Sequence, residues 1–277
     1  MMRGCARSSG RCTPGRGRPG MTAELAAPRR RDLRPLLSFA LVLILWDLAH
    51  RFALVDPRFL PAPLDILTRF VSELRDGTIL ADLAATLRRN LIGLAIGAAA
   101  GVSLGAVLGA SPLVGRIIGP TVVAQRQTAL FAWVPLIAMW FGGGDGGKIA
   151  FIAIAAFQPT VINTWRGIAL VPEGYRELAA SLRFSRLQYL RHVALPAAAP
   201  QIFTGLQAAL IYAWLATVGS ELFMNITPGL GGRLSEGSQL FKMDLLFLAI
   251  AIFGAVGLLY TRLAEALEAK LRKGNRP

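Results

Sequence analysis

The amino-acid sequence predicts an all-helical membrane protein with six transmembrane helices. The chain has 277 residues, of which 54% are hydrophobic and only 17% are charged, whereas soluble domains carry roughly 25% charged residues. The hydrophobic residues gather into segments long enough to cross a hydrocarbon core, which takes about 20 helical residues. The arginines and lysines lie mainly between these segments. Together these observations favour a multi-pass membrane protein over a soluble one.

The first two predicted spans differ in how they should pack. The first covers about Pro35–Phe52 and the second about Leu87–Val114, and the loop between them is broken by Pro61 and Pro63 before a surface helix leads back to the membrane. The second span carries glycines spaced four residues apart: Gly93, Gly97, Gly101, Gly105 and Gly109. Glycines at this spacing allow another helix to approach closely. We favour packing inside one subunit, with a seam between two copies as the alternative.

The remaining four spans are predicted from runs of apolar residues separated by turn-forming or charged stretches. The third covers about Ile118–Phe141, the fourth about Lys148–Trp165, the fifth about Ala197–Phe223 and the sixth about Leu245–Leu263.

The positions of the basic residues predict the orientation. If the N-terminus is cytoplasmic, most of the 30 lysines and arginines fall on the inner side: in the N-terminal tail, at Arg116 and Arg126, in Arg166–Arg191 and in Arg262–Arg276. Cytoplasmic loops of membrane proteins carry such an excess. We therefore expect both termini in the cytoplasm.

The N-terminal tail, residues 1–34, is rich in arginine and glycine and is predicted to be disordered. It lacks the apolar stretch of a signal peptide, and either Met1 or Met21 fits as the start. Cys5 and Cys12 lie in this tail without the spacing of a zinc site. Residues 35–277 form the predicted membrane domain, with a core at about residues 82–264. The net charge of +14 follows this membrane-flanking distribution and does not indicate nucleic-acid binding.

A charged stretch between the fourth and fifth spans requires a separate explanation. Glu177–Leu182 is predicted to form a short helix, and a second helix should start at Ser185, where Ser185 and Gln188 have the spacing of a capping box. Leu195–Pro196 is expected to end this unit. Its apolar face, Leu178, Leu182, Leu187 and Leu190, is expected to pack under the membrane helices. The alternative interpretation is an interfacial helix that merely anchors the chain on the bilayer.

This stretch resembles the signature of permease subunits of ABC importers, "EAA, three residues, G, nine residues, I-x-LP". Here the match is Glu177, Leu178 and Ala179, followed by Val193, Leu195 and Pro196. The glycine of the family is replaced by Arg183. Glycine at this position would serve a left-handed helix end. Arginine in that conformation costs on the order of 1 kcal/mol, and the alternative is a turn that is built differently.

The resemblance extends over roughly residues 37–271. "FAWVPLIAMWFGGGDGGKIAFIAIAAFQPTVINTW", "RFLPAP" and "LQAALIYAWLATVGSELF" are similar to the alkanesulfonate, taurine and nitrate-type permeases. Those permeases usually have prolines just before the region of Trp133, and "RQTALFAW" has none. The resemblance implies a type I ABC importer fold with a cytoplasmic coupling helix between spans four and five, in a bacterial inner-membrane protein.

The same resemblance implies the partners. These are a second copy of the permease, two ATPase subunits, an extracytoplasmic solute-binding protein and the lipid bilayer. The residues implied in coupling to the ATPase are Glu177, Leu178, Ala179, Arg183, Phe184, Ser185, Leu195 and Pro196. The chain itself is not expected to be an enzyme or to need a cofactor, because "GGGDGGKI" at Gly142–Ile149 lacks the hydroxyl residue and the preceding strand of a phosphate loop.

Polar residues inside the spans are candidates for the solute path, because burying them in a membrane is costly. They are Arg126, Gln127, Gln158, Asn163, Gln207 and Glu221. For each one the alternative is a hydrogen bond between helices. An arginine on the path would suit an anionic solute, but sulfonate, taurine, nitrate, bicarbonate and thiamine-precursor importers all remain open.

Two functions from other classes are less well supported by the sequence. An ion-coupled secondary transporter needs carboxylates near the middle of the membrane, and Asp47 is the only one well inside a predicted span. A membrane-anchored interaction protein would not need the charged stretch with its helix break.

Overall fold

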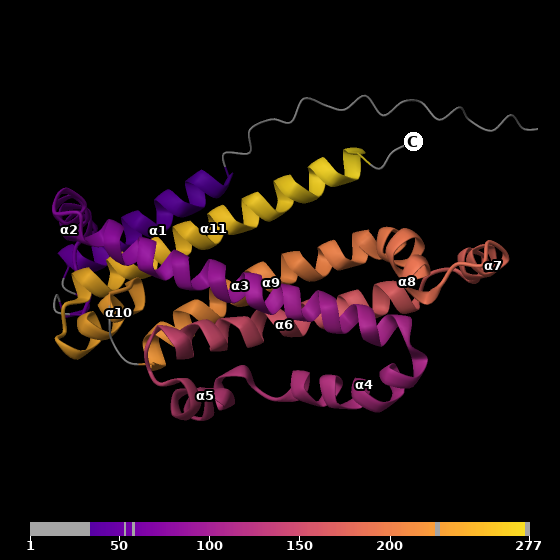
Figure 1. The fold of residues 1–277 in the computed structure, drawn as a ribbon. Helices are drawn as coiled ribbons and strands as arrows, with labels where there is room; N and C mark the ends of the chain where they lie inside the picture. Colours follow the sequence, from indigo (N-terminus) through magenta and orange to yellow (C-terminus); the bar gives the residue numbers. More distant parts are fainter. Residues whose placement is uncertain (1–33, 53, 57–58, 225–227, 275–277) are drawn as a thin grey trace, which may run out of the picture. The chain divides into compact units, whose positions relative to one another are not determined.

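A computed structural model describes residues 34–52, 54–56, 59–224 and 228–274, which are helical or irregular and contain no strand. The tail predicted to be disordered lies outside these residues, except for Arg34. The helices are α1 (Arg34–Arg51), α2 (Pro63–Arg75), α3 (Thr78–Ala110), α4 (Pro112–Gln127), the 3-10 helix η1 (Leu130–Trp133), α5 (Val134–Phe141), α6 (Asp145–Ala169), α7 (Glu173–Ser181), α8 (Arg186–Tyr189), the π-helix η2 (Leu190–Ala194), α9 (Leu195–Phe223), α10 (Leu230–Gln239) and α11 (Met243–Gly274) (Figure 1).

The chain divides into two compact units, Met1–Leu45 and Trp46–Pro277. The described part of the first unit is the beginning of α1. The description below concerns the second unit.

The centre of the second unit is formed by α3, α6 and α9, which pack side by side (Figure 1). The glycines of α3 lie directly against α6. A Cβ atom added at Gly97 would lie 2.2 Å from the carbonyl oxygen of Ala153, and one added at Gly101 would lie 2.7 Å from Cβ of Thr160. We call this contact the glycine seam. The prediction of close packing inside one subunit is therefore confirmed, because α6 of the same chain fills the glycine face.

Three helical segments are long and apolar enough to cross a membrane, namely Thr78–Ala110, Arg186–Phe223 and Met243–Ala266. The pair α4 and η1–α5 makes a fourth if its two parts form one bent span. Two predicted spans do not meet this measure among the described residues. Within its 18 residues α1 holds three charged side chains, and α6 includes polar residues such as Gln158 and Asn163. The count of six spans therefore stays a prediction.

The third predicted span is not one continuous helix. Its two parts, Pro112–Gln127 and Leu130–Phe141, meet at an angle of 100°. Thr128 and Ala129 have extended backbones between them, with ψ of 129° and 126°. Pro135 then lies in the first turn of α5, where a proline is tolerated because its missing N–H would have no helical partner. The bend thus forms without a proline before Trp133.

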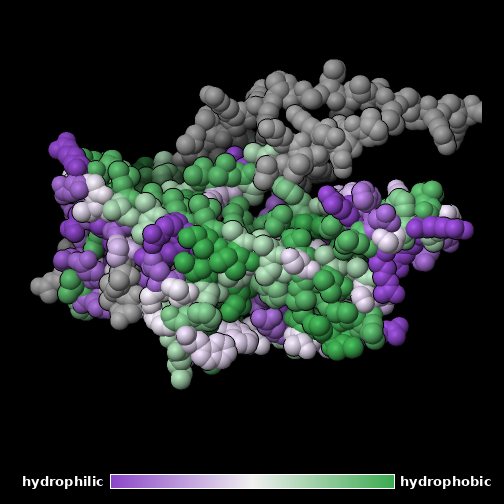
Figure 2. Space-filling view, in the orientation of Figure 1, coloured by the Kyte–Doolittle hydropathy of each residue, from purple (hydrophilic) through white to green (hydrophobic). Residues whose placement is uncertain are grey.

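The surface of the second unit is apolar in its middle. Figure 2 shows hydrophobic side chains over the central parts of the long helices, with hydrophilic side chains gathered near α2 and α10 at one end and near α7 at the other. Exposed apolar residues such as Ile96 and Leu215 are more than half accessible in the isolated chain. A helix surface of this kind suits contact with lipid.

Candidate functional site: the α7–α8 segment and the polar residues of the spans

The segment Glu173–Ala194, here named the α7–α8 segment, contains both short helices that the sequence predicts. The first is α7, which starts earlier than expected and ends in a Schellman motif. The N–H of Phe184 donates to the carbonyl of Ala179 at 2.9 Å, and the N–H of Arg183 donates to that of Ala180 at 3.0 Å. Arg183 has φ of 54°. It therefore occupies the left-handed position that usually holds glycine.

The second short helix begins with the predicted capping box. The N–H of Gln188 donates to Oγ of Ser185 at 3.3 Å, and the N–H of Ser185 donates to Oε1 of Gln188 at 2.8 Å. These two bonds satisfy N–H groups that the first turn of a helix leaves unpaired. The helix then continues through η2 into α9.

The expectation that Leu195–Pro196 ends the unit is wrong. Arg186–Phe223 forms one continuous helical segment of 38 residues. Proline inside an α-helix clashes with the carbonyl four residues earlier and lacks an N–H. Here the π-turn of η2, Leu190–Ala194, precedes Pro196, which falls in the first turn of α9. The wider π-turn leaves room for the proline ring beside the preceding carbonyl groups, so the helix continues.

The side chains of the α7–α8 segment do not pack as the sequence suggested. Ala179 is buried, but Leu178, Leu182 and Leu187 are 58%, 59% and 73% exposed in the isolated chain. We expected these leucines and Leu190 to lie under the membrane helices, and only Leu190 is partly buried and packs against a core cluster. Glu177 is exposed as well, and within the described residues it has no ion pair. The segment therefore presents apolar and charged groups that the chain itself leaves uncovered.

Three of the six solute-path candidates form hydrogen bonds inside the helix bundle. Asn163 donates to the carbonyl of Pro159 at 2.7 Å and accepts from Gln201 at 3.0 Å. Gln158 donates to the carbonyl of Gln125 at 3.5 Å. Gln207 donates to the carbonyl of Ala264 at 3.3 Å. Arg126 and Gln127 differ, since both are exposed at the end of α4.

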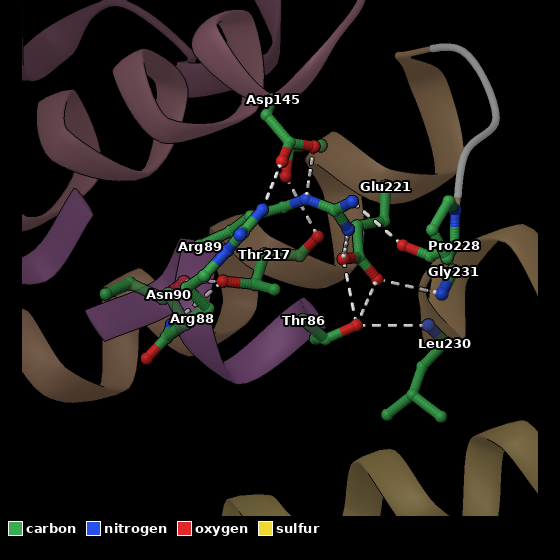
Figure 3. Close-up of polar contacts among 12 residues, drawn as sticks. Thr86, Arg88, Arg89, Asn90, Asp145, Thr217, Glu221, Pro228, Leu230 and Gly231 are labelled. Carbon is green, nitrogen blue, oxygen red and sulfur yellow. Dashed lines mark hydrogen bonds and ion pairs between the residues drawn. The ribbon is translucent and has the colours of Figure 1, made fainter. Parts of the chain in front are cut away.

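The sixth candidate, Glu221, lies in a buried ion network that the sequence did not predict (Figure 3). Its carboxylate accepts from Nη1 of Arg89 at 2.8 Å, from Oγ1 of Thr86 at 2.9 Å and from the N–H of Gly231 at 2.9 Å. Its side chain is 0% exposed and that of Arg89 is 2% exposed. Among the described contacts Glu221 therefore joins helices and does not face an open path.

Arg89 is the centre of this network, which we call the Arg89 network. Its guanidinium also donates to Asp145 at 2.6 Å and to the carbonyl of Pro228 at 2.8 Å. It therefore ties α3 to the start of α6, to the end of α9 and to the residues before α10 (Figure 3). Beside it, Asn90 donates to Thr217 and accepts from Tyr260 of α11. A buried arginine needs such partners, because an unpaired buried charge is strongly destabilising.

A second charged cluster lies near α2 and α10. Arg233 pairs with Glu73 and Asp82, and Arg69 pairs with Glu73 at 2.8 Å and with Asp244 at 3.2 Å. The hydrogen bond to Glu73 raises the pKa of the Arg69 guanidinium above its usual value. An open cavity of about 430 Å³ adjoins this cluster. Arg69 and Arg233, which line this cavity, are already paired with carboxylates of the same chain.

Comparison with known proteins identifies the family. Residues 84–273 match the family "Binding-protein-dependent transport system inner membrane component". The chain is 31% identical to the taurine transport system permease protein TauC of Escherichia coli over 239 residues, which cover 84% of this chain and 86% of that protein. It is 32% identical to the putative aliphatic sulfonates transport permease protein SsuC of Bacillus subtilis over 260 residues, with coverage of 94% and 90%.

A solved structure shares the fold. The match is to the MetNI methionine ABC transporter in inward-facing conformations, with a TM-score of 0.61 and 15% identity, and it covers 70% of this chain and 95% of that chain. The apolar helices and these relatives make the protein a multi-pass membrane protein and a transport subunit. The chain therefore belongs to the binding-protein-dependent inner-membrane components, as an ABC importer permease of the alkanesulfonate, taurine and nitrate type.

Proposed function

We propose that this permease carries a small anionic solute across the bacterial inner membrane, driven by a separate ATPase subunit that docks on the α7–α8 segment. The observation that carries the proposal is the exposed surface of this segment, where Glu177, Leu178, Leu182 and Leu187 are largely accessible among the described residues. Exposed apolar side chains rimmed by charges are typical of a protein interface.

The continuity of the helix suggests how movement would reach the far end of the permease. Ser185 caps α8, and Leu195 and Pro196 lie where η2 passes into α9. The same helix ends beside the Arg89 network through Glu221. A displacement of the docked segment by the ATPase would therefore move α9 along its whole length. In this proposal Ala179, Arg183 and Phe184 shape the turn that orients the docking surface.

The proposed assembly follows the type I importer plan. Six spans place both termini and the α7–α8 segment in the cytoplasm, two copies of the permease form the path, two ATPase subunits bind below, and a solute-binding protein docks outside. The basic residues favour this orientation. Arg126 and Gln127 remain the exposed candidates for contact with the solute, and Gln158, Asn163 and Gln207 are partly buried candidates in the bundle. Relatives named for taurine and aliphatic sulfonates support an anionic solute.

Charge reversal tests the docking proposal. Glu177→Lys should weaken co-purification with the ATPase and lower solute uptake by about tenfold or more, because like or unpaired charges at a buried interface are costly. Glu173→Lys, also exposed in α7, is the matched control and should have a smaller effect. Normal assembly and uptake in Glu177→Lys would leave the segment as an interfacial anchor.

Cysteine labelling tests the orientation. With Cys5 and Cys12 replaced, an impermeant thiol reagent outside intact cells should label cysteines placed at the exposed positions Gly144 and Gln239. It should not label one placed at the exposed Ser181. External labelling at Ser181 would reverse the proposed orientation. Uptake into vesicles by this chain alone, driven by an ion gradient, would favour a secondary transporter.

A further inference from the structure

The α7–α8 segment contains an open hollow of about 230 Å³, lined by Arg176, Ala179, Ala180, Phe184, Arg186 and Tyr189. We name it the arginine hollow. The Schellman turn reverses the chain after α7 and so brings Arg186 and Tyr189 next to Arg176. Its walls are apolar, and the charged groups that line it are two guanidiniums.

The guanidiniums of the arginine hollow lack partners in the described part of the chain. The side chains of Arg176 and Arg186 form no ion pair or hydrogen bond there, in contrast to the paired arginines of α2, α3 and α10. Tyr189 also lines the hollow, but its hydroxyl is buried and is not accessible from it. The two guanidiniums are therefore the groups that can bind a ligand there.

The chemistry of these groups defines what would fill the hollow. Guanidinium groups donate several hydrogen bonds, and a carboxylate accepts two or more of them at once. The alanine and phenylalanine side chains suit the methylene groups of an aspartate or glutamate. The arginine hollow is therefore complementary to an acidic side chain.

The surroundings favour a protein over an anionic lipid as the source of that carboxylate. The α7–α8 segment carries four arginines but also Glu173 and Glu177, both exposed. An anionic bilayer surface would attract the arginines and repel these glutamates. A protein surface can match both signs at separate points.

We propose that the arginine hollow receives a carboxylate side chain of the ATPase subunit, held between Arg176 and Arg186. This inference rests on the proposed function, because it requires that the ATPase docks on the α7–α8 segment. It adds which groups meet at one point of that interface: two guanidiniums of the permease and a carboxylate of the ATPase.

The first experiment measures binding of the full-length permease, purified in detergent, to the ABC ATPase subunit of the same importer. Arg176→Gln combined with Arg186→Gln should weaken binding by about tenfold or more. The matched control is Arg191→Gln, which removes an exposed cation outside the hollow. It should change binding by less than about twofold, as exposed ion pairs contribute little.

The second experiment identifies the partner residue by charge exchange. Arg186→Glu is combined with single Asp→Lys or Glu→Lys changes across the ATPase, and one such change should restore binding. The same change should not improve the control Arg191→Glu. This arm measures a gain of binding, so a variant that merely folds poorly does not produce the expected result.

The outcomes separate the inference from the proposed function. Equal binding by the wild type and the Arg176/Arg186 variant would overturn the inference while leaving the ATPase as a partner. Loss of bound anionic lipid from that variant with unchanged ATPase binding would also overturn it. Absence of any wild-type complex with the ATPase would refute the proposed function itself.

Discussion

Replacing one glycine of the glycine seam by alanine should destabilise the permease through steric conflict alone. At Gly97 the added Cβ would lie 2.2 Å from the carbonyl oxygen of Ala153 and 2.9 Å from Cβ of Ala156. An ordinary contact begins at 3.4 Å. Because the nearest atom is a backbone oxygen, no side-chain rotation relieves the clash, and α3 and α6 must move apart by roughly 1 Å. A gap of about this size loses up to half of the dispersion attraction between the atoms on either side.

The magnitude follows from two opposing effects. Overpacking a well-packed interface costs about 1–3 kcal/mol, and backbone contact places Gly97→Ala at the upper end of that range. Alanine also favours the helix over glycine by about 0.5–1 kcal/mol. A net loss of about 2 kcal/mol remains, which corresponds to a decrease in Tm of about 4–8 °C for a chain of this size.

The matched control is Gly254→Ala in α11, where an added Cβ meets nothing within 4 Å. It should leave Tm unchanged or slightly higher. Thermal unfolding of the purified proteins in one detergent, followed by tryptophan fluorescence, gives both values. If Gly97→Ala and Gly254→Ala unfold at the same temperature, the seam does not hold α3 against α6 and the steric reasoning is wrong.

Three further substitutions test local features by the same or related measurements. Arg89→Ala leaves the buried Glu221 without its counter-ion and should cost about 3–5 kcal/mol; adding Glu221→Gln should recover part of the lost Tm. Arg183→Gly relieves a left-handed arginine and should leave Tm and ATPase binding unchanged or improved, by about 1 kcal/mol at most. Ser185→Ala removes the cap of α8 and should cost about 1 kcal/mol, seen as faster hydrogen exchange of the amides of α8 without loss of the membrane fold.

Local patterns in the sequence were sufficient to predict several features. The four-residue glycine spacing predicts the seam, because helix geometry brings those positions to one face. The pair Ser185 and Gln188 predicts the start of α8, since a capping box involves only four residues. The signature left two possibilities at Arg183, a left-handed backbone or a differently built turn, and the structure has the first, with φ of 54°. Each of these depends on residues that are close together in the chain.

Features that depend on distant residues were missed. Arg89 contacts Asp145 and Glu221, which lie 56 and 132 residues away in the chain, and no periodic pattern connects them. The only sequence feature that pointed to an ion network was the position of Arg89, Asp145 and Glu221 near the ends of apolar segments. The bend after Gln127 forms without a proline, and the passage of α8 into α9 depends on a π-turn. Neither has a reliable local signature.

The glycine seam also limits which movements the permease can make during transport. Sliding α3 along α6 would push Cβ atoms of α6 across the backbone of α3, and rotating either helix would bring larger side chains into the gap. The Arg89 network fixes the same two helices at one end. We therefore expect α3 and α6 to move as one rigid body, with changes of shape confined to the bend at Thr128–Ala129 and to the α7–α8 turn. Spin labels on α3 and α6 should keep a constant separation with and without ATP, and a change in that distance would contradict this expectation.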